Sequence, residues 1–131
     1  METALCMVFI VVPLVLGIIE FGAMLTFRQA LSQAASEGAR ATVGAPSGDV
    51  TSAATAAIKN VMDGQTYLST NCSNGLNCDI SSPYSCDGGV HTCVKVVVSA
   101  DYKNLDGAIT FPGMSFAVPS KLSFTSTVEV S

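Results

Sequence analysis

Four cysteines and the chain's one histidine are the side chains best suited to chemistry. His91 lies in a stretch of 22 residues that also holds Cys72, Cys78, Cys86 and Cys93. A catalytic cysteine needs a base beside it, so Cys72 and His91 form one candidate nucleophile–base pair. An even number of clustered cysteines is more typical of disulfides, in which no thiol remains to react. We therefore interpret His91 as a surface residue and expect no catalytic residue and no enzyme activity.

The spacing of these cysteines also argues against a metal site. Successive cysteines are separated by five, seven and six residues, whereas paired zinc ligands usually have only a few residues between them. Two disulfides in an oxidising compartment are the favoured interpretation, with zinc as the alternative. Of the three possible pairings, we favour the local one, Cys72 with Cys78 and Cys86 with Cys93. No metal and no cofactor are expected.

The charge composition excludes one large class of partner. The net charge is −4, and the six basic residues are scattered singly along the chain. Nucleic-acid binding requires a basic patch, so no nucleic-acid partner is expected. Catalytic signatures such as G-x-S-x-G, a P-loop or H-E-x-x-H do not occur either. The sequence therefore favours a structural or binding role.

A single acid, Glu20, interrupts an otherwise apolar run over residues 4–27. As a helix this run would span about 36 Å, enough to cross the ~30 Å hydrocarbon core of a bilayer. A charge at the bilayer centre costs about 2.5–3.5 kcal/mol and usually marks a functional contact. We favour a contact between Glu20 and a polar or basic group on a neighbouring copy, because Gly17 and Gly22 would permit close helix approach. The alternative is that Glu20, which precedes Arg28 by two helical turns, simply reaches the membrane interface.

Two signals for membrane orientation disagree. Disulfides would place the C-terminal part outside the cytoplasm. Arg28 and Arg40 follow the apolar run, and by the positive-inside rule they would place that part inside. We interpret the conflict as a sign that a basic leader has been removed ahead of Met1 while the apolar segment was kept. The alternative is that Met1 is the initiator and the chain breaks the rule.

The apolar run continues into a more polar segment with helical periodicity. An i, i+4, i+8 ladder of apolar residues begins at Leu31, and Gly44 marks a helix end. One helix over about residues 3–43 would be roughly 60 Å long. Pro13 and Gly17 favour a kink or local unwinding within it.

A second, shorter helix is expected over residues 50–62. Asp49 or Ser47 would cap its start and Gly64 would end it. Residues 65–92 then lack periodicity and are rich in Ser, Asn, Gly and Cys. We interpret them as a disulfide-stapled loop with room for short strands.

Alternating apolar residues predict strands in the last third of the chain, over residues 93–104, 114–120 and 121–130. One face of the first would carry Val94, Val96, Val98 and Ala100, and one face of the last would carry Leu122, Phe124, Ser126 and Val128. A roughly three-stranded antiparallel sheet would then pack on the second helix and on residues 27–43.

These elements together place the chain in the α+β class with two parts. A long hydrophobic helix for membrane insertion and assembly would occupy residues 1–45. A small disulfide-stapled globular head would occupy residues 46–131.

The first third of the chain also resembles a known family. The segment VPLVLGIIEFGAMLTFRQALSQAASEGARATVG is similar to the N-terminal segment of TadE-like proteins, the pilin-related subunits of tight-adherence (Tad) pilus systems. Pro13, the GIIEFG motif at residues 17–22 and the AASEGAR motif at residues 34–40 stand at the matching places.

This resemblance implies a precursor in the inner, cytoplasmic membrane that a prepilin-type peptidase cuts. Pilus assembly machinery would then build it into a helical filament of identical subunits, an extracellular structure related to type IV pili and used in cell adhesion. The resemblance also implies an acid near the mature N-terminus that contacts a terminal amine. Glu2 aligns with that acid, and Thr3 stands where the family typically has an aromatic residue.

The expected function is therefore a pilin-like structural subunit. Its assembly contacts would involve Glu2, Pro13, Gly17, Glu20, Gly22 and Arg28. One alternative is a minor pilin that initiates assembly. Another is a membrane-anchored periplasmic or surface binding module that recognises a ligand through residues 65–93.

Overall fold

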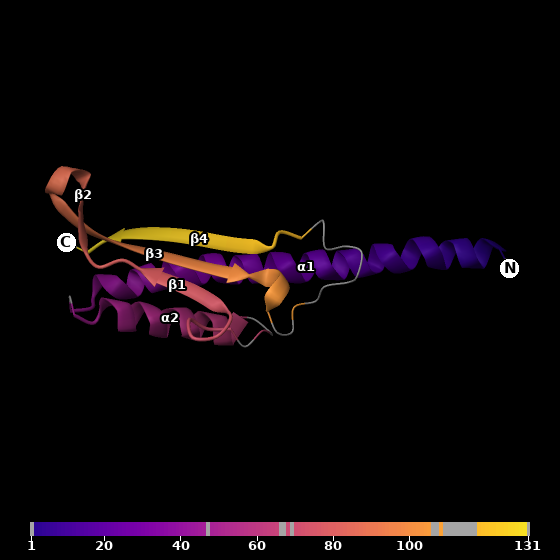
Figure 1. The fold of residues 1–131 in the computed structure, drawn as a ribbon, viewed down its shortest axis with the longest axis horizontal. Coiled ribbons are helices and arrows are strands. Elements are labelled where there is room, and N and C mark those ends of the chain that lie inside the picture. The colour runs from indigo at the N-terminus through magenta and orange to yellow at the C-terminus, as the bar shows by residue number, and fades with distance from the viewer. Residues whose placement is uncertain are drawn as a thin grey trace.

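A single helix, α1 (Glu2–Val43), runs the length of the molecule, and the other elements lie along its C-terminal half (Figure 1). The computed structural model describes residues 2–46, 48–65, 68, 70–105, 108 and 118–130. The N-terminal half of α1 projects beyond the rest of the chain. The expected α+β architecture, a long helix continuing into a small head, is confirmed.

The bounds of α1 agree with the sequence prediction. The helix is continuous through Pro13 and Gly17, so local unwinding does not occur there, and a kink at these residues stays a prediction. A proline within a helix removes one backbone hydrogen bond, and the helical bonds on either side hold this segment together. The chain leaves the helix at Gly44, as expected.

The second helix, α2 (Val50–Gln65), begins where the sequence predicts and ends later. The Asp49 carbonyl accepts hydrogen bonds from the Ala53 N–H at 3.0 Å and from the Ser52 hydroxyl at 2.9 Å, which fixes the first turn. Gly64 lies inside the helix and does not end it, so that prediction was wrong. A glycine commonly ends a helix by adopting a left-handed conformation, and Gly64 does not adopt it. Ser47, the other predicted cap, lies outside the described residues.

Four strands form one antiparallel sheet around the long strand β3 (His91–Asp101). The strand β4 (Lys121–Glu129) pairs with one side of β3 along its whole length. On the other side, β1 (Leu76–Ile80) pairs with one end of β3 and β2 (Tyr84–Cys86) with the opposite end. Two short 3-10 helices, Asp87–Gly89 and Tyr102–Asn104, bracket β3.

The sheet therefore has one strand more than the three that were expected. β1 and β2 both lie within the loop predicted over residues 65–92, in which the sequence analysis allowed short strands. Of the strand predicted over residues 114–120, residues 114–117 lie outside the described part of the chain. Residues 118–120 are not part of a strand.

The inner face of the sheet packs on α1 and α2 and closes the core. The alternate residues of β3 predicted to share a face are buried: Val94, Val96, Val98 and Ala100. From α2, the core receives Ala54, Ile58 and Met62. On α1 the Phe27 ring lies 5.4 Å from the Tyr102 ring, centroid to centroid. The C-terminal half of α1 is thus part of the head's core as well as a continuation of the apolar helix.

Candidate assembly surface on the long helix

The buried face of α1 begins abruptly at Glu20. From there, buried residues recur at alternating steps of four and three, the spacing of a helix covered along one stripe: Glu20, Met24, Phe27, Leu31, Ala34 and Gly38. Leu16 and Gly17 are half-buried, and the described residues before them are exposed. Glu20 therefore marks the junction between the covered and the uncovered half of the helix.

The uncovered half of α1 is almost entirely apolar. Its side chains, together with Phe21 and Leu25 just past Glu20, include some of the most exposed large hydrophobic residues of the described chain, with Phe9 76% exposed: Leu5, Met7, Val8, Phe9, Ile10, Val11, Val12, Leu14, Val15, Ile18 and Ile19. The most apolar 18-residue window of the helix has a mean hydropathy of 2.7 and is only 6% buried. By length and composition, α1 could cross a membrane. An exposed apolar surface this long must be covered by lipid or by other protein.

Three residues predicted to make subunit contacts lie together on this uncovered half. Pro13, Gly17 and Gly22 line one shallow apolar groove of about 550 Å³, whose other lining residues are Leu14, Ile18 and Phe21. A Cβ added at Gly22 would meet nothing within 4 Å. The chain's own fold therefore does not require glycine at position 22, and the groove has room for a side chain from outside.

Glu20 does not line this groove and is instead buried within its own chain, with 1% of its surface exposed. Burial of a carboxylate is costly unless other groups of the protein interact with it, and Glu20 does take part in an interaction within its own chain. The structure of the single chain thus places Glu20 at the head–helix junction. Its predicted contact with a neighbouring copy stays a prediction.

Arg28 lies in contact with the sheet. Its guanidinium carbon is 5.8 Å from the centroid of the Phe124 ring, a cation–π geometry that joins α1 to β4. The same side chain borders a small hollow together with Lys121 and Ser123 of β4. Glu2 is the first residue of α1 in the described chain. Of the six predicted contact residues, the structure therefore groups Pro13, Gly17 and Gly22 and places Arg28 on the head.

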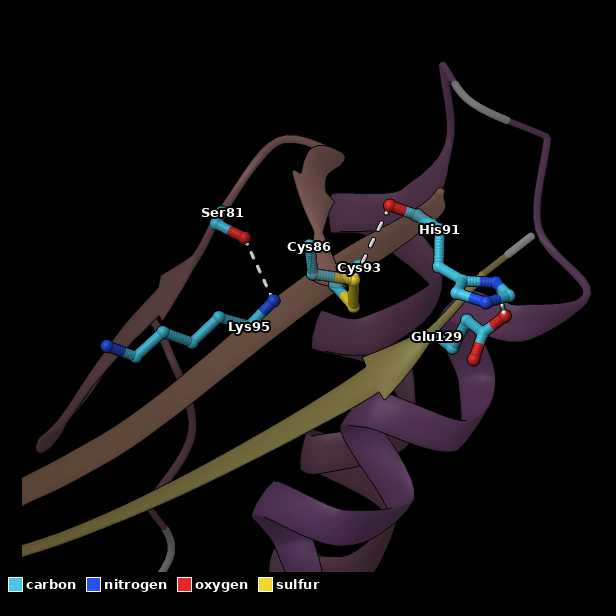
Figure 2. The surroundings of a disulfide bond; sticks show 6 residues. All are labelled: Ser81, Cys86, His91, Cys93, Lys95 and Glu129. Atoms are coloured by element: carbon cyan, nitrogen blue, oxygen red, sulfur yellow. Dashed lines mark hydrogen bonds and ion pairs between the residues drawn. A yellow bond between two sulfur atoms is a disulfide. The ribbon is translucent and has the colours of Figure 1, made fainter. Parts of the chain in front are cut away.

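Both predicted disulfides are present, with the local pairing. Cys72 is bonded to Cys78 and Cys86 to Cys93. The second disulfide joins β2 to β3 (Figure 2), and β2 lies at the end of the sheet farthest from the N-terminus (Figure 1). Because all four sulfurs are in disulfides, the zinc alternative and the Cys72–His91 pair are both wrong. The fifth cysteine, Cys6, is a free and exposed thiol on the apolar half of α1.

His91 is exposed, as expected, and lies beside Glu129 of β4. Its Nδ1 atom is 2.5 Å from the Glu129 Oε1 atom, across the β3–β4 pair (Figure 2). Nearby, the Lys95 backbone N–H donates a hydrogen bond to the Ser81 hydroxyl at 2.9 Å. Within the described residues, no group of three or more His, Cys, Asp or Glu residues could hold a metal ion. These contacts hold strands together and show no arrangement of an active site.

Sequence reasoning missed two kinds of residue in this surface. Leu14, Ile18 and Phe21 form walls of the groove, and their helical spacing from Pro13 and Gly17 could have identified them. Phe124, the partner of Arg28, could not have been found this way, because it is about a hundred residues away in sequence and meets α1 only in the folded head.

Comparison with known proteins agrees with this organisation. Residues 1–40 match the model of the TadE-like protein family. No curated protein and no solved structure matches the chain. The N-terminal segment, which carries the groove and Glu20, is TadE-like, and a TadE-like segment on a long hydrophobic helix is consistent with a pilin-like protein of a Tad pilus.

Proposed function

We propose, from its TadE-like N-terminal segment, that this chain is a pilin-like structural subunit of a Tad-related pilus. The observation that supports this most strongly is the uncovered apolar half of α1, which ends where the head begins at Glu20. In the precursor this half would lie in the inner membrane. After processing and assembly by the pilus machinery, it would pack against the same segment of neighbouring copies in a filament.

The physical argument is that one helix surface must suit two environments. Lipid covers it before assembly and other helices cover it afterwards, so the hydrophobic effect alone gives little preference for the filament. Close packing must supply that preference, and small residues allow helix backbones to approach each other. The groove that includes Pro13, Gly17 and Gly22 is the feature of this chain best shaped for such packing.

The division of the chain follows from the same argument. We propose that the uncovered part of residues 1–45 forms the assembly helix. Residues 46–131, with the C-terminal half of α1, would form the outer surface of the filament. The two disulfides, which suit an oxidising exterior, would then lie on the side away from the filament axis.

The two acids of α1 would have different roles in this filament. Glu2, at the start of the helix, is the better candidate for a contact with a neighbour's terminal amine. Glu20 is buried by its own head, so a neighbouring amine or arginine can reach it only if the covering residues move. If Glu20 does meet such a group, an incorrect axial register would leave its charge unpaired, and the pair would fix the stagger between subunits.

The test is electron microscopy of material sheared from cells, combined with intact-mass analysis of the protein in it. We expect filaments whose subunit mass corresponds to this chain with two disulfides, less any residues removed in processing. Reduction and alkylation should then label four more cysteines than alkylation alone. If the protein stays in the membrane fraction and no filament contains it, a membrane-anchored binding module becomes the better interpretation. If the protein occupies only rare sites along a filament made of another subunit, a minor pilin becomes the better interpretation.

A further inference from the structure

Among the described residues, the outer edge of β4 carries charges only at its two ends, Lys121 and Glu129. One side of β4 is hydrogen-bonded to β3, and no described strand pairs with the other side. The segment between Lys121 and Glu129 contains no charge and no proline. Proteins usually protect such edges with charges, prolines or bulges, because a free edge is a template for another strand.

The opposite edge of the sheet shows that protection. There β1 and β2 are separated by Ser81, Ser82 and Pro83, none of which is in a strand. A disulfide also joins β2 to β3 at this edge. Within the described residues, the sheet is therefore interrupted along one edge and has an unpaired strand, β4, along the other.

The backbone of β4 is oriented for pairing at its free edge. Just past the strand, the Val130 N–H donates a hydrogen bond to the Thr92 carbonyl at 2.8 Å. Hydrogen-bonded and non-hydrogen-bonded pairs alternate along two antiparallel strands. In the β3–β4 register, the even-numbered residues of β4 therefore direct their backbone N–H and C=O groups toward β3. Odd-numbered residues then direct theirs toward the free edge. The side chains of these odd-numbered residues are all exposed: Lys121, Ser123, Thr125, Thr127 and Glu129.

We propose that β4 pairs antiparallel with β4 of a second copy of this chain, about a two-fold axis at Thr125. In this register Lys121 lies opposite Glu129 of the other copy, and Ser123 lies opposite Thr127. Every hydrogen-bonded pair in this register joins two odd-numbered residues, so the hydrogen-bonding alternation of an antiparallel ladder is kept. The two-fold axis produces the Lys121–Glu129 pair twice.

The charges around β4 support this register. Within its own sheet, Lys121 is already opposite Asp101, so the pairing would place its ammonium group between two carboxylates. Shifting the second strand by two residues would remove both Lys121–Glu129 pairs. Opposite charges directly across an antiparallel pair are favourable, and like charges are unfavourable.

The pairing would join copies that point in opposite directions. β4 runs nearly parallel to α1 (Figure 1), so a two-fold axis across β4 directs the two apolar helices to opposite sides. Such a pair cannot form between neighbours in one membrane or one filament. It would instead link heads that face each other from two filaments or two cells. The β4 pairing itself does not depend on the proposed function, whereas its placement between two filaments rests on it.

Disulfide trapping of the full chain in detergent tests the register directly. In a Cys6→Ser background, we expect Thr125→Cys to form a dimer on mild oxidation, because residues opposite each other lie about 5.5 Å apart at Cα, within disulfide range. Ser123→Cys alone should not form a dimer, because the two cysteines at position 123 of the two copies would be offset by roughly 13 Å along the strands. Mixing Ser123→Cys with Thr127→Cys should restore the cross-link. Absence of the Thr125→Cys dimer, or equal dimerisation of all three single variants, would overturn the proposal.

A charge exchange tests the energetic part of the inference. Lys121→Glu and Glu129→Lys should each weaken dimerisation about ten-fold in sedimentation experiments, since two pairs of opposite charge become pairs of like charge. The double variant should recover most of the loss. Glu129→Lys also removes the contact with His91, but the double variant lacks that contact too, so recovery reports the contact between copies. A double variant as weak as either single one would contradict the proposed register.

Discussion

Gly38 of α1 lies against Ile58 of α2 so closely that a Cβ added at Gly38 would be 2.9 Å from the Ile58 Cγ1 atom. The added carbon would also be 3.1 Å from Cδ1 of the same side chain and 3.5 Å from Cγ1 of Val96 on β3. The two helices and the sheet therefore meet at a residue that has no side chain. This contact fixes the distance between α1 and α2 in the head.

Gly38→Ala should destabilise the head by about 1–2 kcal/mol. Overpacking of a core typically costs about 1–3 kcal/mol, and the better helix propensity of alanine returns up to ~1 kcal/mol. Thermal unfolding followed by circular dichroism in detergent would measure the difference. In an Ile58→Ala background the cost of Gly38→Ala should largely disappear. An equal cost in both backgrounds would show that Ile58 is not the cause.

The Arg28–Phe124 contact predicts a modest energetic coupling between α1 and β4. A double-mutant cycle with Arg28→Met and Phe124→Leu should give a coupling free energy of about 0.5–1 kcal/mol. Arg40→Met is the matched control, because Arg40 is exposed and its ion pair among the described residues, with Glu37 at 3.5 Å, lies within its own helix. That control should change the free energy of unfolding by no more than about 0.5 kcal/mol. Additive effects of the first two substitutions would exclude the cation–π contact.

Removing either disulfide should lower stability by about 2 kcal/mol, since each closes a short loop and constrains the unfolded chain. The sequence separations are 6 for Cys72–Cys78 and 7 for Cys86–Cys93, so the two losses should be similar. Paired serine substitutions and thermal unfolding would measure them. Cys6→Ser is the control, because this thiol is free and exposed and its loss should not change the unfolding midpoint.

The elements predicted correctly are those in which one periodic pattern extends over many residues. The end of α1 could be located because helical periodicity continues up to Gly44, which interrupts it. The faces of β3 and β4 could be assigned because apolar residues recur at alternate positions over most of each strand. The local disulfide pairing was favoured from the cysteine spacing, and the fold adds its reason: β2 and β3 bring Cys86 and Cys93 onto neighbouring strands.

The features that sequence analysis missed or could not place depend on contacts between distant segments. β1 and β2 are only 5 and 3 residues long, and each becomes a strand because β3 offers it a partner. The grouping of Pro13 with Gly17 and Gly22 follows from helix geometry and was partly foreseen. The burial of Glu20 was not, because the helix alone does not reveal where the head begins to cover it.

Substitutions at Glu20 can separate a role within the chain from a role between copies. Glu20→Ala should destabilise the monomer by about 2 kcal/mol or more, because it leaves a cavity and removes a buried interaction. Glu20→Gln keeps the shape and should change stability less. If Glu20 also meets a neighbour's cation, the Gln variant should form fewer filaments or filaments with a different helical rise. Normal filaments with unchanged rise from Glu20→Gln would restrict the residue to the head–helix junction.

Filling the groove on α1 should block assembly while leaving the subunit folded. Gly22→Leu places a side chain in open space, so we expect the unfolding midpoint in detergent to stay the same or rise slightly. The same side chain would occupy the groove that a neighbouring helix needs, and the yield of sheared filaments should fall at least ten-fold. Val15→Leu is the matched control, because Val15 is also exposed on α1 but does not line the groove. A normal filament yield from Gly22→Leu would show that subunits pack through another face of the helix, and loss of filaments from both variants would show that the whole apolar surface is packed tightly.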